Sequence, residues 1–117
     1  MYKNKIVGKY GEDAACKYLK KLGYLIIERN FLCKSGEIDI IAQDENELVF
    51  IEVKLRTSYI YGRGLEAIDN RKIKKMKKSA LYYIYVNKKE KAFIRFDAIE
   101  ICLGNSKIEL KHYKNII

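Results

Sequence analysis

Apolar residues recur every three or four positions between about Asn4 and Leu22, which predicts an amphipathic helix. Gly23 follows this stretch directly, and glycine is a common residue at the end of a helix. The same spacing returns between about Asp69 and Val86 and predicts a second helix, with Asp69 or Asn70 as its N-cap. The apolar stripe of the first helix consists of Val7, Tyr10, Ala14, Ala15, Tyr18, Leu19 and Leu22.

Shorter apolar runs bounded by polar residues predict the strands. The predicted strands cover Tyr24–Leu32, two arms of a hairpin around the polar tip Gln43–Glu47, Ala92–Cys102 and Lys107–Tyr113. The order is therefore helix, three strands, helix, two strands. This order predicts an α/β fold in which a central mixed β-sheet of about five strands is flanked by helices. At 117 residues, we expect residues 1–117 to form a single domain.

The hairpin carries acids where an ordinary hairpin carries apolar residues. If its turn is centred between Glu45 and Asn46, Asp39 faces Glu52 across the two strands. Opposed side chains in antiparallel strands have Cβ atoms about 4.5–5.5 Å apart, and like charges so placed are destabilising. A hard divalent cation between the two carboxylates would remove this cost. Lys54 lies two residues beyond Glu52 on the same face, and this grouping suits metal-assisted hydrolysis.

A simpler interpretation of these charges is that they are solvated at the strand ends. In the same register Glu37 faces Lys54, and such a pair can be an ion pair of little consequence. The opposite face of the hairpin favours burial instead, because it is apolar throughout. We expect it to contain Ile38, Ile40 and Ala42 opposite Val53, Ile51 and Val49.

The first helix contains a glycine at an unexpected place. Gly11 lies near the middle of the apolar stripe, where we expect another backbone to pack closely. Glu12 lies at the margin of that stripe. On this pattern alone it is either an exposed helix acid or an acid that points into a cleft beside the hairpin.

The histidine and cysteine content excludes several kinds of site. His112 is the only histidine, so His-pair metal sites are excluded and a Ser-His or Cys-His nucleophile is disfavoured. The cysteines are odd in number and widely spaced, as expected of reduced thiols rather than disulfides or zinc ligands. They are Cys16, Cys33 and Cys102. No apolar run approaches the ~20 residues that span a bilayer, and no signal core follows the N-terminus, so we expect a cytoplasmic protein without membrane contact.

The net charge of +9 and the pI near 9.4 suggest a polyanionic partner, with nucleic acid as the first candidate. A lysine-rich composition can also follow from a biased genome. The lysines of the second helix form either a phosphate-binding ridge or a solvated face. The segment Arg56–Gly64 mixes arginine, tyrosine and glycine, and it can clamp a nucleic-acid backbone or simply connect two elements.

Several short motifs in a fixed order resemble the YraN-like family of small bacterial proteins. The resemblance runs from Gly8 to about Asp97, and that family in turn resembles the PD-(D/E)xK nuclease superfamily, which includes Holliday junction resolvases and type II restriction endonucleases. The matching residues are Gly8-x-x-Gly11-Glu12, Arg29-Asn30, Gly36-Glu37-Ile38-Asp39, Phe50-x-Glu52-Val53-Lys54-x-Arg56, Gly62 and Lys72. The chain departs from the superfamily signature in one place, where Ile38 replaces a proline.

The resemblance implies a restriction endonuclease-like core and a nuclease that uses Mg2+ or Mn2+ on DNA, including branched DNA. Asp39 and Glu52 would bind the metal, and Glu12 would complete its shell or hold a second ion. Lys54 would orient or help activate the attacking water, and Lys72 would match a helical lysine near the active site. Resolution of a junction needs two active sites, so the resemblance is also compatible with a homodimer. A module that binds nucleic acid without cutting it, or an adaptor with the same fold, is the alternative. The residues expected to contact nucleic acid are Arg56, Arg63, Lys72 and Lys75.

Overall fold

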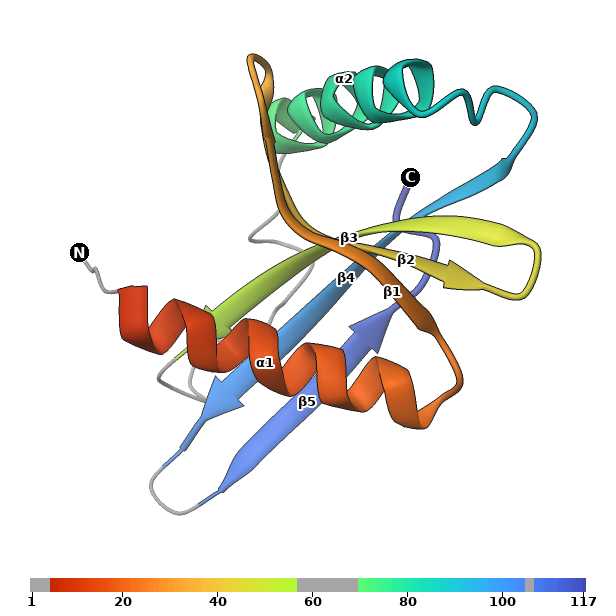
Figure 1. The fold of residues 1–117 in the computed structure, drawn as a ribbon. Helices are drawn as coiled ribbons and strands as arrows, with labels where there is room; N and C mark the ends of the chain where they lie inside the picture. The colour runs from red at the N-terminus through yellow and green to blue at the C-terminus, as the bar shows by residue number, and fades with distance from the viewer. Residues whose placement is uncertain (1–4, 57–69, 105–106) are drawn as a thin grey trace.

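The computed structural model describes residues 5–56, 70–104 and 107–117. These residues form two helices and five strands in the predicted order (Figure 1). The elements are α1 (Lys5–Lys21), β1 (Leu25–Cys33), β2 (Gly36–Asp44), β3 (Glu47–Arg56), α2 (Asn70–Val86), β4 (Phe93–Leu103) and β5 (Ile108–Tyr113). The predicted α/β class with a mixed five-stranded sheet is confirmed.

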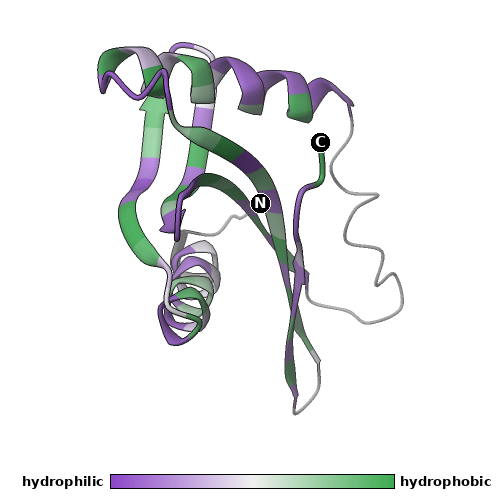
Figure 2. Cartoon of the chain, turned by 90° about the vertical axis from the view of Figure 1, so that its right-hand side faces the viewer, coloured by the Kyte–Doolittle hydropathy of each residue, from purple (hydrophilic) through white to green (hydrophobic). Residues whose placement is uncertain are grey.

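The five strands form one sheet in the order β1-β2-β3-β4-β5. Neighbouring strands are antiparallel, except that β3 and β4 run parallel. A parallel pair requires a crossover between its strands, and α2 belongs to that crossover. In Figure 2 α1 is seen end-on below and α2 runs across the top, with the curved sheet between them.

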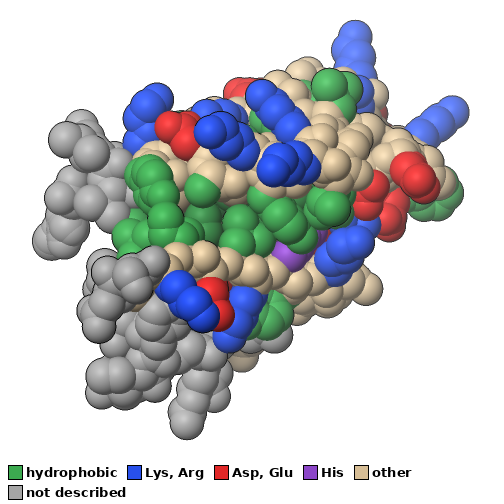
Figure 3. Space-filling model, turned by 90° about the horizontal axis from the view of Figure 1, so that it is seen from below, with side chains coloured by type: hydrophobic (Ala, Val, Ile, Leu, Met, Phe, Trp, Pro, Cys, Tyr) green, Lys and Arg blue, Asp and Glu red, His purple; other side chains and the backbone are tan. Residues whose placement is uncertain are grey.

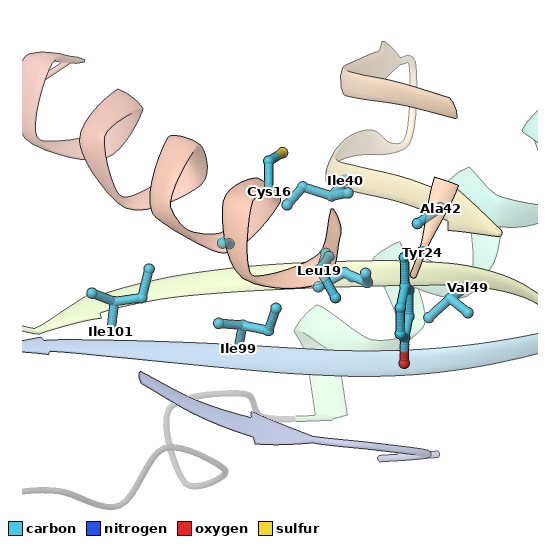
Figure 4. Packing of buried hydrophobic residues seen from close by; sticks show 10 residues of the cluster. Cys16, Leu19, Tyr24, Ile40, Ala42, Val49, Ile99 and Ile101 are labelled. Carbon is cyan, nitrogen blue, oxygen red and sulfur yellow. The ribbon is translucent and has the colours of Figure 1, made fainter. Parts of the chain in front are cut away.

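Two separate apolar clusters attach the helices to the sheet. The cluster under α1 contains buried residues of β2, β3 and β4, and Figure 4 shows Cys16 of α1 beside Ile40 of β2, with Ile99 and Ile101 of β4 beneath the helix. The cluster under α2 joins this helix to the other face of the sheet. Its buried members are Ile38, Ile41, Leu48, Phe50, Met76, Ala80, Tyr83, Ile84 and Phe96. The central strands β2, β3 and β4 are thus covered on both faces over much of their length, which is why their sequences are apolar on both faces.

The predicted end of the first helix is confirmed. Gly23 has a φ of +97°, and the Tyr24 N–H donates a hydrogen bond to the Leu19 carbonyl at 3.0 Å. This six-residue closure with a left-handed glycine is a common helix C-cap. Among the described residues, neither helix combines the length and the apolarity that crossing a membrane would need.

Two packing predictions for individual residues are wrong. Gly11 is buried, but a Cβ added there would meet side chains of Leu55 and Ile101 at 3.4–3.9 Å rather than another backbone. Ile38 packs in the cluster under α2, whereas Ile40 packs under α1 with Val49 and Ile51. The physical reason for the second error is a bend in β1 and β2. The same bend shapes the candidate site.

Candidate active site

The hairpin register was predicted correctly. The paired residues run from Asp44–Glu47 to Ile40–Ile51, with the turn centred between Glu45 and Asn46. Asp39 and Glu52 are the next opposed positions, where the pairing of β2 with β3 ends. The Val53 N–H donates a hydrogen bond of 2.8 Å to Oδ2 of Asp39, so a side-chain carboxylate accepts a bond that a backbone carbonyl would otherwise accept.

The hairpin opens at Asp39 because β2 bends there together with β1. Arg29 pairs with Ile40, and Phe31 pairs with Ile38, but Asn30 between them has a φ of +54° and no partner in the register. Asparagine tolerates this left-handed conformation better than most residues. The bend breaks the side-chain alternation of β2 at Asp39, which explains why Ile38 lies on the α2 side.

Beyond the bend, β2 and β3 have different neighbours. Glu37 pairs with Leu32 of β1, while Lys54 pairs with Glu100 of β4. The predicted opposition of Glu37 and Lys54 is therefore not part of the observed sheet. Lys54 is half-buried on β3 and is not among the described residues that line the cavity between the hairpin and α2.

A cavity of about 410 Å³ lies between the open end of the hairpin and the first turns of α2. Both acids predicted to bind a metal, Asp39 and Glu52, line this cavity, as the register requires. The side chains from α2 are mainly cationic. The remaining lining residues are Gly36, Glu37, Arg71, Lys72, Lys75 and Met76.

The carboxyl group of Asp39 is strongly perturbed. Burial and the nearby charge of Glu52 raise its pKa from 3.8 to about 8, against the hydrogen bond from the Val53 N–H, which lowers it. Glu12 and Glu37 add to the increase. The ionised form of Asp39 is therefore costly beside Glu52, and a cation in the cavity would reduce that cost.

Lys72 of α2 supplies a positive charge at this position. Its Nζ lies 2.6 Å from Oε2 of Glu52, whose side chain is only 6% exposed. Lys72 was predicted to contact nucleic acid. In this structure its ammonium group contacts one of the two carboxylates instead.

Glu12 lies in a neighbouring cavity of about 710 Å³ together with Arg29, Asn30 and Glu37. Its Oε1 is 3.5 Å from a guanidinium nitrogen of Arg29. Glu37 lines both cavities, and its pKa is raised by burial and by the charges of Glu12 and Glu52. Within the described ranges, no three His, Cys, Asp or Glu side chains approach closely enough to form a metal-binding group. The structure thus brings Asp39 and Glu52 together and leaves Glu12 in the next cavity.

The structure describes two of the three remaining residues predicted to bind nucleic acid, Arg56 and Lys75. Arg56 forms an ion pair with Glu100, whose side chain is 1% exposed. Arg63 lies outside the described residues. Lys75 is exposed and lines the cavity, as a residue that contacts phosphate should.

Sequence reasoning missed a buried polar network on the α1 face of β4. Nε2 of His112 lies 2.7 Å from Oδ2 of Asp97, and Nδ1 of the same ring lies 2.9 Å from the Tyr18 hydroxyl. Arg95 donates two hydrogen bonds to Asp97 and others to Asp44, Glu47 and the Tyr24 hydroxyl. Burial and the charge of Asp97 raise the pKa of Tyr18, so its phenol is not activated as a nucleophile. The sequence did contain a signal for this network. The predicted strand Ala92–Cys102 carries charged residues, and ordinary central strands lack such a charge pattern.

The donor set of the cavity fits a hard divalent cation. Asp39 and Glu52 offer carboxylate oxygens on neighbouring strands, and burial together with the charge of Glu52 raises the pKa of Asp39, so a bound cation would favour its ionised form. Mg2+ in proteins is commonly held by one or two carboxylates and completed by water and phosphate oxygens. The pair therefore meets the minimum protein contribution for such a site.

Comparison with known proteins places the chain in a family. Residues 11–101 match the uncharacterised protein family UPF0102. A UPF0102 protein of Clostridium botulinum (strain Hall) is 53% identical over 117 residues, which cover 97% of this chain and 95% of that protein. A UPF0102 protein of Clostridium perfringens is 46% identical over 114 residues, with 96% and 93% covered. The chain therefore belongs to the uncharacterised protein family UPF0102, the YraN-like family that its motifs resemble.

Proposed function

We propose that this protein is a metal-dependent nuclease of the PD-(D/E)xK type that acts on DNA. The observation that carries the proposal is the convergence of Asp39 and Glu52 on one cavity whose far wall is cationic. Acids on one side and cations on the other suit a phosphodiester, because the acids can hold a metal while the cations receive phosphate oxygens.

Asp39 and Glu52 are the residues that would hold Mg2+ or Mn2+, with negative charge contributed by Glu37 in the same cavity and by Glu12 in the adjoining one. When bound, such an ion would polarise the scissile phosphate and lower the pKa of a coordinated water. Asp39 has to release its proton before it can act as a ligand. Its hydrogen bond from Val53 keeps the carboxylate oriented toward the cavity while it does so.

The cationic residues have distinct tasks in this proposal. Arg71 and Lys75 line the cavity from α2 and would bind the DNA backbone without selecting a sequence. Lys72 has to leave Glu52 when a metal binds, and its ammonium would then be available to a phosphate oxygen. Lys54 does not line the cavity, so its side chain would have to reorient before it could stabilise developing negative charge, a contribution of roughly 10²-fold for a positioned charge.

A module that binds nucleic acid without cutting it is the second candidate. The ion pair of Lys72 with Glu52 favours it, because this contact already neutralises one of the two acids. Lys54 also lies apart from the residues that line the cavity. A protein of this kind would keep the cationic surface of α2 and use the acids only for folding.

A cleavage screen separates the two candidates. Duplex, flap, fork, four-way-junction and single-stranded substrates would be incubated with Mg2+ or Mn2+ and with wild-type protein, Glu52→Gln or Glu45→Gln. Glu45 is exposed in the β2–β3 turn and serves as the matched control. If the protein is a nuclease, the wild type and Glu45→Gln cut DNA, Glu52→Gln does not, and all three proteins bind DNA equally. Salt-sensitive binding without cutting on every substrate would support the binding module and exclude the nuclease.

A further inference from the structure

The strand β5 forms one edge of the sheet. Within the described part of the chain it pairs with β4 on one side only, from Leu103–Ile108 to Ala98–Tyr113. An edge strand presents backbone N–H and C=O groups that can pair with a further strand. An edge that stays solvated often carries charged side chains, so the arrangement of charges on β5 decides what it can pair with.

The register identifies which backbone groups point outward. The Gly104 N–H donates to the Lys107 carbonyl at 2.8 Å, so residue 107 directs its backbone groups toward β4. Backbone direction alternates along a strand, and residues 109, 111 and 113 therefore also face β4. The outward groups belong to Ile108, Leu110 and His112.

The side chains of this strand are complementary to a second copy of the same strand. When two antiparallel β5 strands meet at Leu110, Ile108 faces His112 of the other copy, and the outward backbone groups of all three residues find partners. In the same register Glu109 faces Lys111 of the other copy, twice by symmetry. Both Glu109–Lys111 pairs occupy positions without mutual hydrogen bonds, where opposed side chains are closest.

Neighbouring registers are less favourable. A two-fold axis at residue 109 would place Glu109 against Glu109, and an axis at residue 111 would place Lys111 against Lys111, both of which are destabilising. An axis at Ile108 would leave Lys111 without an acidic partner, and an axis at His112 would leave Glu109 without a cationic partner. Only the register centred on Leu110 satisfies both the backbone and the charges.

Apolar surface beside this edge supports the same pairing. Figure 3 shows a strip of apolar side chains between α1 and β5, close to His112. On the α1 face of β5, Leu110 is partly buried against the core and Ile108 is 56% exposed. A second copy would cover Ile108 and extend the apolar layer through both molecules. The partly buried apolar side chains packed against the core under α1 include Ala14, Tyr18 and Leu103.

We propose that two copies of this chain pair through their β5 strands, antiparallel and centred on Leu110, to form one continuous sheet. A two-fold axis perpendicular to a sheet leaves the same face of both copies on the same side. The two candidate sites, which lie on the α2 face, would therefore open in the same direction. The pairing does not rest on the proposed nuclease activity, and its test needs no substrate.

Charge exchange tests the pairing directly. The mass of wild type, Glu109→Lys, Lys111→Glu and the double variant would be measured by light scattering across a concentration series. The monomer has a mass of 13.8 kDa, and the wild type is expected to show twice this value. Each single change places like charges opposite one another and should weaken the dimer at least about tenfold, whereas the double change restores both pairs. Glu90→Lys, in the exposed turn after α2, should leave the dimer unchanged.

Hydrogen exchange of the wild type provides a second measurement that does not depend on the folding of any variant. The amides of Ile108, Leu110 and His112 should become protected as the concentration rises. A monomeric wild type at all concentrations would overturn the proposal and leave the edge to a strand of another protein. A dimer that ignores the single changes, a double variant that folds but stays monomeric, or outward amides that exchange freely in a dimer would each overturn it as well.

Discussion

The ammonium nitrogen of Lys72 lies 2.6 Å from Oε2 of Glu52, at the wall of the cavity that Asp39 also lines. The two partners differ in exposure, since the Lys72 side chain is 42% exposed and the Glu52 side chain 6%. The buried acid is fixed by its strand, while the exposed lysine can move into solvent. A divalent cation that binds Glu52 therefore competes with Lys72 rather than with a rigid part of the protein.

The first prediction concerns this competition. Lys72→Met should raise the affinity for Mn2+ by about tenfold, because it removes a cation that contacts one of the two ligands. Titration calorimetry with Mn2+ on the protein alone measures the change. Lys75→Met is the matched control, since Lys75 lines the same cavity one turn further along α2. An equal gain in Mn2+ affinity for both variants would mean that the total charge around the cavity, and not the contact with Glu52, controls metal affinity.

The second prediction concerns Asp39. The pKa of Asp39 is about 8 in the folded protein, whereas its ordinary value is 3.8. Between pH 3.8 and about pH 8, folding is therefore accompanied by the uptake of a proton. The contribution of Asp39 to stability is therefore greatest below about pH 4 and is lost as the pH rises through about 8. Asp39→Asn keeps an oxygen acceptor for the Val53 N–H and removes the charge. We expect it to stabilise the metal-free protein by about 1 kcal/mol or more at about pH 9.

Urea unfolding at about pH 4 and about pH 9 tests this expectation. The free energies of unfolding of variant and wild type should be similar at the lower pH, and the variant should be the more stable protein at the higher pH. A variant that is less stable than the wild type at both values would show that the ionised carboxylate stabilises the fold. Added Mg2+ should stabilise the wild type more than Asp39→Asn, by mass action on the folded state.

Much of the fold followed from local patterns. Helical spacing, Gly23 and the alternation of the strands located both helices and all five strands to within about two residues. The register of the hairpin also followed, because a slip of one residue would have moved its apolar residues to the wrong face. These features depend on neighbours along the chain or across one turn, which the sequence displays directly.

The errors arose where distant parts of the chain meet. The bend at Asn30 and Asp39 redirects Ile38 toward α2 and separates Glu37 from Lys54, and neither bend position is a glycine or a proline. The contacts of Lys72 and Arg56 with buried acids depend on how α2 and β4 approach β3. Such contacts are set by tertiary packing, so the sequence identified these cations but not their partners.

The third prediction separates folding from binding at Arg56. This residue forms an ion pair with Glu100, which is 1% exposed, and removing one partner of a buried pair leaves an uncompensated charge. Arg56→Ala should therefore lower the free energy of unfolding by about 3 kcal/mol. Denaturant unfolding measures this loss. The double variant Arg56→Met with Glu100→Leu should recover part of it, because both charges are then absent.

The contrasting variant is Lys75→Ala. An exposed lysine that contacts phosphate should leave stability unchanged, weaken DNA binding for all sequences and reduce the salt slope by about one. If Arg56→Ala unfolds like the wild type but binds DNA poorly, then Arg56 acts on nucleic acid as its sequence motif suggested, and the contact with Glu100 contributes little.

The last prediction concerns the network around Asp97. Burial alone would raise the pKa of this carboxyl group, but hydrogen bonds from His112, Arg95 and the Asn115 N–H lower it below 3.8. A lowered folded pKa means that the stabilisation is present above about pH 4 and is lost as the pH falls further. Asp97→Asn should cost about 3 kcal/mol at neutral pH, because it removes the charge that holds Arg95 in a buried position.

Urea unfolding from neutral to acidic pH distinguishes this role from a general effect of removing an acid. Asp44→Asn is the control, because Asp44 is 26% exposed and accepts from the same guanidinium group, so its loss should cost about 1 kcal/mol or less. The difference between Asp97→Asn and the wild type should shrink at acidic pH, where the native carboxylate takes up its proton. A constant difference at every pH would mean that the shape of the network, and not its charge, stabilises the C-terminal strand.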